Sequence, residues 1–454
     1  MSNSLSVIAS LNQDSIPANS PVRLAYLLVQ IQPGAMSAET MPVNLNIVVD
    51  NSDSMGIIIL TEEQINRLRQ TGHVTDVTVD GVSAFHFDNM PVEYQHNAPR
   101  DHVKRALDDV AQRIKPRDKY SLVVFARDAR VLVRNQSGKD TRALDKAVGE
   151  MDNLKLGNDT RMATGMQKGI DEVKRGFSRE MVNRMIVLTD GFTTDAQQCR
   201  ALAAQAAQAG ISISTMGLGA EFNEDLLISI SDSSGGNAYL IHSPDEITNI
   251  FEQELAGAQN VILRDLDLKM RLMQGVELRH AYRVKPTIAD LGVLPVAERS
   301  IDLPLGELNR NGEIALLFEL LVPPRAMGTY QLAHLVTEYN QPGAGVSQKD
   351  RQDCVIQYTP SPMPVPVNPQ VMNMVETISA FRLHTRALED AARGDVSGAT
   401  QKLQAAATRL INMGESELAQ TALDEAANLQ QKGQMSADGT KKLRYDTRRL
   451  TQRL

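Results

Sequence analysis

The sequence contains no tryptophan, only two cysteines, and few aromatic residues, which make up 4% of its 454 positions. With so few rings, it offers little for stacking nucleic-acid bases. The net charge of −8 also argues against nucleic acid, whose phosphates bind basic surfaces. Two cysteines, Cys199 and Cys354, are too few for a disulfide framework, so we expect free, buried thiols.

Long apolar runs are also missing. No window approaches the roughly 18 consecutive apolar residues of a membrane-spanning helix. The start of the sequence has neither the basic region nor the apolar region of a signal peptide. We therefore expect a cytoplasmic protein without membrane contact. The composition, 42% hydrophobic and 22% charged, is that of a globular protein, and the length fits two to four domains of about 100–200 residues.

After a short apolar strand at 45–50, the sequence alternates between strands and amphipathic helices from Ala98 to about residue 255. This alternation predicts an α/β domain with a mostly parallel, doubly wound sheet, similar to a Rossmann fold. The pattern predicts strands at 45–50, 120–125, 129–133, 185–189, 211–217 and 238–241, and helices at 101–114, 141–151, 164–175, 195–209, 224–230 and 244–255.

The flanking regions have a different pattern. Residues 1–40 and 258–358 alternate apolar and polar residues between Gly, Pro and Asn, which is typical of a β-sandwich. We expect the two regions to pack together, so that the α/β domain is inserted into one sandwich. Residues 359–369 carry five prolines and predict a semi-rigid linker. Residues 370–454 predict an α-helical domain, either a helical-hairpin array or a three- or four-helix bundle, whose basic last helix we interpret as a solvated charged face.

Three polar segments adjoin elements of the predicted α/β domain. Asp50, Ser52 and Ser54 follow its first strand, Thr160 precedes a helix, and Asp190 ends a later strand. In a doubly wound sheet, ligands bind beyond the carboxyl ends of the strands. Two carboxylates and three hydroxyls form an oxygen-rich set that suits a hard cation such as Mg²⁺. Because the set carries only two negative charges, the metal stays electron-poor and accepts one further acidic oxygen.

This arrangement resembles the metal-ion-dependent adhesion site of von Willebrand factor A domains, over roughly residues 41–257. All five family ligand positions are filled, by Asp50, Ser52, Ser54, Thr160 and Asp190. The resemblance implies that these residues bind Mg²⁺, with Mn²⁺ or Ca²⁺ as alternatives, and that the metal binds an acidic side chain of a protein partner. The flanks resemble those of bacterial proteins with this domain and, more distantly, inter-alpha-trypsin inhibitor heavy chains.

The sequence departs from the family pattern beside the first loop. Residues 57–97 form an insertion between that loop and the next helix, and they either cap the metal site, build a partner surface or are a tolerated surface excursion. Asp53 and Asp159 add negative charge near the metal, which raises cation affinity and discourages an acidic partner. Four histidines in or near the insertion lack zinc-like spacing, so we expect ordinary histidines: His73, His86, His96 and His102.

Three functions remain in contention. The first is a metal-dependent protein-interaction module that catalyses nothing. The second is a cytoplasmic scaffold or adaptor subunit of an AAA+ ATPase or signalling complex. The third is a metal-dependent hydrolase, which is disfavoured because the sequence contains no P-loop and no G-x-S-x-G elbow.

Overall fold

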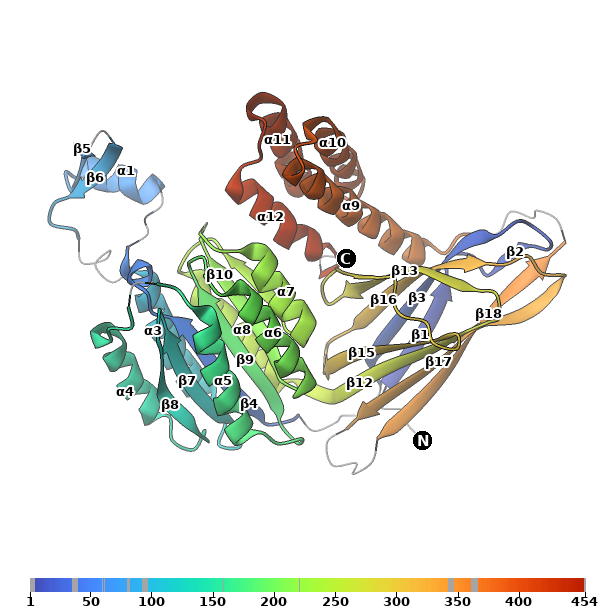
Figure 1. The fold of residues 1–454 in the computed structure, drawn as a ribbon, viewed down its shortest axis with the longest axis horizontal. Coiled ribbons are helices and arrows are strands. Elements are labelled where there is room, and N and C mark those ends of the chain that lie inside the picture. Colours follow the sequence, from blue (N-terminus) through green and yellow to red (C-terminus); the bar gives the residue numbers. More distant parts are fainter. Residues whose placement is uncertain are drawn as a thin grey trace. The chain divides into compact units, whose positions relative to one another are not determined.

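The computed structural model describes residues 5–34, 40–58, 60, 62–79, 82–91, 97–157, 159–219, 221–341, 347–360 and 366–452. The chain divides into two compact units (Figure 1). Unit 1 comprises Met1–Met41 and Asn260–Leu454, and unit 2 comprises Pro42–Gln259.

Unit 2 is built on a six-stranded sheet in the order β11-β10-β9-β4-β7-β8. All neighbours are parallel except β7 and β8, which pair antiparallel. Every residue of the central strands β4 and β9 is buried, as expected for a parallel sheet covered on both faces. The strands are β4 (Val43–Asp50), β7 (Lys119–Phe125), β8 (Ala129–Ser137), β9 (Val182–Thr189), β10 (Ser212–Leu218) and β11 (Ala238–Ile241).

Six helices of unit 2 accompany this sheet: α3 (Pro99–Arg113), α4 (Arg142–Glu150), α5 (Met162–Gly176), α6 (Ala196–Gln208), α7 (Glu224–Ser234) and α8 (Glu246–Gln259). Helix α5 packs against β4, β7, β8 and β9. Its glycines permit this close approach, since a Cβ at Gly165 would lie 2.7 Å from Phe125 and one at Gly169 would lie 2.5 Å from Asn46. These contacts hold the start of α5 against the central strands, where the candidate ligands lie.

The insertion forms a small substructure of unit 2. It contains α1 (Glu62–Gln70) and an antiparallel hairpin of β5 (Val74–Val79) and β6 (Val82–Phe87). Leu68 and Val74 are buried together, with Leu60, Ile65 and Met90 against them. The insertion therefore has secondary structure and a small apolar core of its own, while its role stays a prediction.

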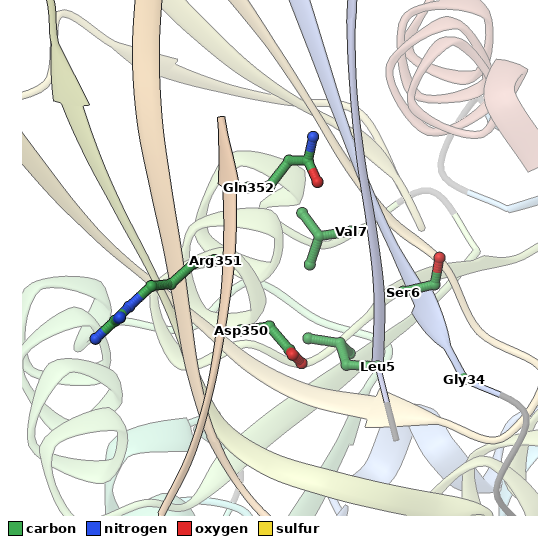
Figure 2. A pocket seen from close by; sticks show the side chains of 7 residues that line it. All are labelled: Leu5, Ser6, Val7, Gly34, Asp350, Arg351 and Gln352. Atoms are coloured by element: carbon green, nitrogen blue, oxygen red, sulfur yellow. The ribbon is translucent and has the colours of Figure 1, made fainter. Parts of the chain in front are cut away.

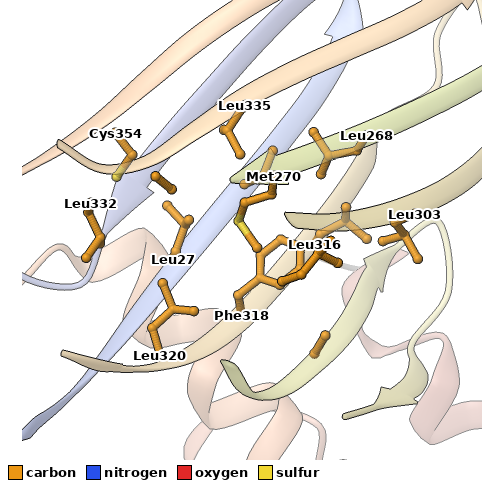
Figure 3. Packing of buried hydrophobic residues seen from close by; sticks show 14 of the residues in the cluster. Leu27, Leu268, Met270, Leu303, Leu316, Phe318, Leu320, Leu332, Leu335 and Cys354 are labelled. Atoms are coloured by element: carbon orange, nitrogen blue, oxygen red, sulfur yellow. The ribbon is translucent and has the colours of Figure 1, made fainter. Parts of the chain in front are cut away.

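Unit 1 contains two five-stranded sheets, ordered β1-β3-β16-β13-β14 (sheet A) and β15-β12-β17-β18-β2 (sheet B). One hydrophobic core lies between them, and Figure 3 shows part of it, including Leu27, Met270 and Phe318. The strands are β1 (Leu5–Leu11), β2 (Ser15–Pro17), β3 (Arg23–Pro33), β12 (Val261–Leu272), β13 (Glu277–Lys285), β14 (Ala289–Gly292), β15 (Ser300–Asn309), β16 (Ile314–Val322), β17 (Gly328–Asn340) and β18 (Gln348–Thr359).

Four helices of unit 1 follow the strands: α9 (Pro369–Ala392), α10 (Val396–Asn412), α11 (Ser416–Lys432) and α12 (Ala437–Arg448). They share a second hydrophobic cluster with sheet A, to which Leu28, Tyr282 and Leu317 contribute. Sheet A is therefore covered on both faces, which explains the continuous apolar run of β16. Glu319, only 4% exposed, accepts a hydrogen bond from Arg382 of α9 at 2.9 Å.

The predicted fold class is confirmed: the chain has a mostly parallel α/β domain, a β-sandwich and a C-terminal helical region. Both cysteines are free and buried, also as expected. The solvated charged face predicted for the last helix is wrong, because Lys441 is buried and the described basic side chains after it are half-buried. This helix packs against α9 and α11, and its Lys442 forms a salt bridge with Glu417 of α11. Its own sequence does not reveal these partners.

The domain boundaries stay proposals. Strand β3 from the first flank pairs with β16 from the second, so both flanks build the same sheet. The helices and sheet A share one hydrophobic cluster and belong to one compact unit. A boundary between a sandwich domain and a helical domain near residues 358–370 therefore stays a proposal. Within the linker predicted at 359–369, residues 361–365 lie outside the described part. No helix among the described residues is long and apolar enough to cross a membrane.

Candidate metal centre

Asp50 is the last residue of β4 and is fully buried. Its carboxylate has two protein donors. Oδ1 accepts the backbone N–H of Ser52 at 2.9 Å, and Oδ2 accepts the hydroxyl of Thr189 at 2.7 Å. Thr189 ends the neighbouring strand β9, so this bond joins the carboxyl ends of two adjacent strands.

The loop after β4 turns through a short 3₁₀ helix, Asp53–Gly56. Met55, fully buried, anchors this turn in the core. The hydroxyls of Ser52 and Ser54 lie 3.0 Å apart, and Ser54 donates to Oδ1 of Asp190 at 2.9 Å. The structure therefore links four predicted ligands in one hydrogen-bonded chain: Asp50, Ser52, Ser54 and Asp190.

The strand order explains why these residues meet. After β4 the chain continues to β7 and β8 on one side, and then returns to β9 on the other side of β4. The connections on the two sides diverge at this point, which leaves a crevice at the carboxyl ends of β4 and β9. Asp50 and Asp190 follow these two ends, at the position where doubly wound folds bind ligands.

Thr160 lies in the loop before α5. A Cβ placed on Gly191, the residue after Asp190, would lie 3.5 Å from its hydroxyl oxygen. The backbone oxygen of Thr160 accepts the hydroxyl of Thr193 at 3.1 Å and the N–H of Thr194 at 3.2 Å. The fifth predicted ligand is thus held against the Asp190 loop, although within the described chain its hydroxyl makes no hydrogen bond to the other four ligands.

Two residues that hold this loop escaped the sequence analysis. Thr193 accepts the N–H of Met162 at 3.0 Å, and Asp195 accepts the N–H of Ala163 at 3.2 Å. Thr193 also donates to Asp195 at 2.6 Å. Asp195 precedes α6 and was assigned to that helix, but its side chain caps the first turn of α5. Because such a cap crosses between segments, the sequence spacing carries no signal for it.

Arg100 is another residue that the sequence analysis missed. Its guanidinium donates to the backbone oxygen of Ser52 at 2.9 Å and to that of Asn51 at 3.4 Å. This side chain comes from α3, immediately after the insertion. It fixes the backbone of the loop that carries the two serines.

Burial raises the pKa of both acids. Burial is the main cause for Asp50, opposed by the hydrogen bonds from Thr189 and Ser52. The pKa of Asp190 rises to about 6, first through burial and then through the charge of Asp50. Within the described chain, neither carboxylate forms a salt bridge, although the charge of the Arg100 guanidinium lowers the pKa of Asp50 slightly against the effect of burial. Two facing acids without a cation between them suit a divalent metal ion.

The side chains present fit a hard cation better than a soft one. The centre contributes carboxylate and hydroxyl oxygens, the ligand types that Mg²⁺ prefers. Among the described residues, no group of three His, Cys, Asp or Glu side chains is placed to hold a metal ion. The expectation of ordinary histidines stays a prediction. His102, for example, is buried in α3 and hydrogen-bonds to Asn97 at 2.8 Å, whereas His96 lies outside the described residues.

The surface around the centre is not uniformly acidic. Asp53 is exposed, whereas the carboxylate of Asp159 forms a 3.3 Å ion pair with Arg161, which offsets its charge. Two apolar side chains lie exposed on the same loops: Phe192, two residues after Asp190, and Ile57, at the end of the 3₁₀ turn, are each 63% exposed. Exposed apolar groups beside a polar site are typical of protein-binding surfaces.

Two family models match the chain. The von Willebrand factor type A domain matches residues 94–253, and the "Sll0103-like, C-terminal alpha-helical domain" matches residues 369–453. The first match contains Thr160 and Asp190 but begins after the Asp50 loop and most of the insertion. The family model therefore supports the domain, while the five-residue metal site remains a prediction.

Two curated relatives are similar in sequence. "Uncharacterized protein sll0103" from Synechocystis sp. is 27% identical over 320 residues, which cover 68% of this chain and 74% of that protein. "Uncharacterized protein YfbK" from Escherichia coli is 22% identical over 225 residues, covering 48% of this chain and 38% of that protein. The match thus spans well under half of the second relative.

Two solved structures share the fold over nearly the whole chain. The von Willebrand factor type A protein from Catenulispora acidiphila has a TM-score of 0.73 and 16% identity, covering 99% of this chain and 97% of that one. The ArnB paralog VWA2 from Sulfolobus acidocaldarius has a TM-score of 0.55 and 15% identity, covering 99% and 98%. At such identities these likenesses show the fold alone.

Proposed function

Because the chain carries a von Willebrand factor type A domain followed by a helical domain of the Sll0103 type, we propose that it is a metal-dependent protein-interaction module. Domains of this type commonly mediate protein interactions and often bind a divalent metal. The observation that carries the proposal is the hydrogen-bonded chain of Asp50, Ser52, Ser54 and Asp190 at the crevice between β4 and β9. Thr160 completes the proposed ligand set.

In this proposal the five residues hold Mg²⁺, with Mn²⁺ or Ca²⁺ as alternatives. The bound ion would supply a Lewis acid that accepts a carboxylate oxygen from the partner. Arg100 and Met55 keep the serine loop in place, and Thr193 and Asp195 keep Thr160 beside Asp190. We propose binding without catalysis, since the sequence lacks the nucleotide-binding and nucleophile motifs named above.

The exposed side chains on the same loops support a protein partner. Phe192 and Ile57 offer apolar contacts beside the oxygen ligands, so an acidic residue flanked by apolar side chains would satisfy both features. The ion pair of Arg161 with Asp159 reduces the repulsion that an acidic partner would meet. The cytoplasmic scaffold or adaptor remains the alternative, and it differs in not requiring the metal.

Calorimetric titration of Mg²⁺ and Mn²⁺ into the protein tests the metal site. We expect binding by wild type, loss of binding in the Ser52→Ala/Ser54→Ala double variant, and retention in Thr194→Ala, a control at an exposed position of the neighbouring loop. Absence of binding by wild type, or equal binding by the double variant, would contradict the proposed ligands.

A pull-down from lysate with and without chelator separates the two functions. We expect a metal-dependent module to lose its partner when the metal is removed and also in the serine double variant. Retention of the same partner under both conditions favours the scaffold. Nucleotide hydrolysis measured with and without Mg²⁺ tests the absence of catalysis, and a rate that Asp190→Ala abolishes would overturn it.

A further inference from the structure

The exposed edges of the three larger sheets, two in unit 1 and one in unit 2, differ in how they are protected. Edge strands expose unpaired backbone groups and pair with other chains unless shortness, charge, proline or irregular pairing prevents it. Strands β2, β11 and β14 have only three or four residues. Strand β15 contains Pro304 and pairs irregularly with β12. Arginines on β8 and a run of charges on the open half of β18 protect the remaining edges: Arg130, Arg134, Lys349, Asp350, Arg351 and Asp353.

Strand β1 has none of these protections. Its seven residues, Leu5–Leu11, contain no charge, no proline and no glycine. It pairs with β3 in an unbroken register and lies at the end of sheet A. Among the described residues, no backbone hydrogen bond joins β1 to any other element. Its outer edge is therefore a template for a further strand.

The sequence of β1 is nearly the same in both directions. Read backwards, Leu-Ser-Val-Ile-Ala-Ser-Leu differs from the forward sequence only in that Val7 and Ala9 exchange positions. If two copies pair antiparallel about Ile8, Leu5 lies opposite Leu11, Ser6 opposite Ser10, and Ile8 opposite itself. An interface in which the same strand faces itself about a two-fold axis is the commonest arrangement in dimers.

The faces of the strand agree with this register. Leu5, Val7, Ala9 and Leu11 point toward the sandwich core, whereas Ile8 on the opposite face is 46% exposed. In the proposed pair, each odd-numbered residue lies opposite an odd-numbered residue and each even-numbered residue opposite an even-numbered one. Because side chains alternate between the two faces of a strand, opposite residues point to the same face of the sheet. The apolar face of the added strand therefore continues the core face of sheet A.

A groove lies beside β1, and an added strand would bury part of its lining. It has a volume of about 330 Å³ and lies between β1 and β18, lined by Leu5, Val7, Asp350 and Gln352, among others. Figure 2 shows these four side chains between the two strands, with Ser6 and Arg351 on the far sides. Leucines of a second copy, facing the core from the neighbouring position, would close the open end of this groove.

We propose that two copies of this chain form a symmetric dimer by antiparallel pairing of their β1 strands, with the two-fold axis at Ile8. The partner is a second copy because the strand is complementary to itself, uncharged and unprotected. The dimer joins two copies of sheet A into one continuous sheet. This association is independent of the metal centre, whose residues all belong to unit 2.

Sedimentation equilibrium of the full-length protein, from about 1 to 100 µM, spans the dissociation constants of weak to moderate interfaces. We expect wild type to dimerise in this range. Ile8→Lys and Ile8→Glu each place like charges opposite each other at the axis and raise the dissociation constant at least about tenfold. Because Ile8 is exposed, neither change disturbs the core. An equimolar mixture of the two variants restores dimers, since only the mixed pair juxtaposes opposite charges.

Val355→Lys is the matched control, because Val355 is an exposed apolar residue on strand β18, 52% exposed. We expect it to dimerise like wild type. A wild type that stays monomeric throughout the concentration range overturns the proposal. Dimers that persist in both Ile8 variants, or a mixture that stays monomeric when wild type dimerises, overturn the proposed strand and axis.

Discussion

Asp190 and Asp50 are the two acidic residues of the proposed metal site, and their burial and negative charge affect both protein stability and metal binding. Asp50 is fully buried and Asp190 is half-buried, and the charge of Asp50 makes ionisation of Asp190 harder. Each carboxylate accepts a hydrogen bond from a hydroxyl group, but these neutral donors do not compensate its negative charge. Without metal, the ionised pair therefore destabilises the fold, and a bound cation offsets that cost.

Replacement of Asp190 tests this cost directly. We expect Asp190→Asn to abolish Mg²⁺ binding and to leave the metal-free protein at least as stable as wild type at pH 7, because the change removes repulsion without emptying a core position. Thermal unfolding with and without Mg²⁺ measures both effects. Asp171→Asn, at an exposed position of α5, is the control. A large loss of metal-free stability in Asp190→Asn would show that the acid is a structural residue.

The stability of metal-free wild type depends on pH through the same acid. The pKa of Asp190 is raised from 3.8 to about 6 in the folded state. Between these values the folded chain binds more protons than the unfolded chain, so this contribution to stability falls as pH rises from about 4 to 6. The full loss at pH 7 is about 3 kcal/mol. Urea unfolding across this range measures it, and a profile unchanged in Asp190→Asn would contradict the assignment.

At the scale of helices and strands, the start of α5 is the element that positions Thr160. Asp195→Ala removes the acceptor for the N–H of Ala163 and a partner of Thr193. We expect a loss of about 1–2 kcal/mol in unfolding free energy, as for other helix caps, and weaker Mg²⁺ binding because Thr160 is no longer held. Equilibrium denaturation and calorimetry measure the two effects, with Thr194→Ala as the control. Unchanged metal affinity would argue against Thr160 as a ligand.

The elements of the α/β domain were predictable because each is long, periodic and bounded by turn residues. The predicted strand at 185–189 became β9, Val182–Thr189, and the helix at 164–175 became α5, Met162–Gly176. The short strands β2 and β14 were missed, since three or four residues carry no detectable period. Missed residues such as Arg100 and Asp195 act through contacts between distant segments, which no spacing within one segment reveals.

The orientation of the last helix was mispredicted for a related reason. Its basic residues indicate a solvated face when the helix is considered alone. In the fold, Leu443 and Leu450 join the cluster shared with sheet A, and Lys442 pairs with Glu417. Burial of this helix depends on its packing against α9 and α11, which the sequence of the helix alone does not reveal.

For the whole molecule, the helices and the sandwich form one unit, whereas the α/β domain forms another. A chain that ends at residue 358 leaves Leu28, Tyr282 and Leu317 of sheet A uncovered. We therefore expect this truncated chain to aggregate or unfold. Residues 42–259 alone should fold and bind Mg²⁺ as the full chain does. Circular dichroism and calorimetry of both pieces test this, and a stable, soluble 1–358 chain would show that the helices are dispensable.

The insertion of unit 2 also has a consequence for the order in which the protein assembles. Gln30 on β3 and Glu313 beside β16 hydrogen-bond across 283 positions of sequence. Strand β3 therefore cannot pair with β16 until the ribosome has synthesised unit 2. Once unit 2 folds, its two ends emerge beside each other, and Met41 donates to Val261 at 3.2 Å. Folding of the inserted domain thus shortens the flexible loop that must close when β3 pairs with β16. The folded α/β domain therefore lowers the entropic cost of assembling sheet A during biosynthesis.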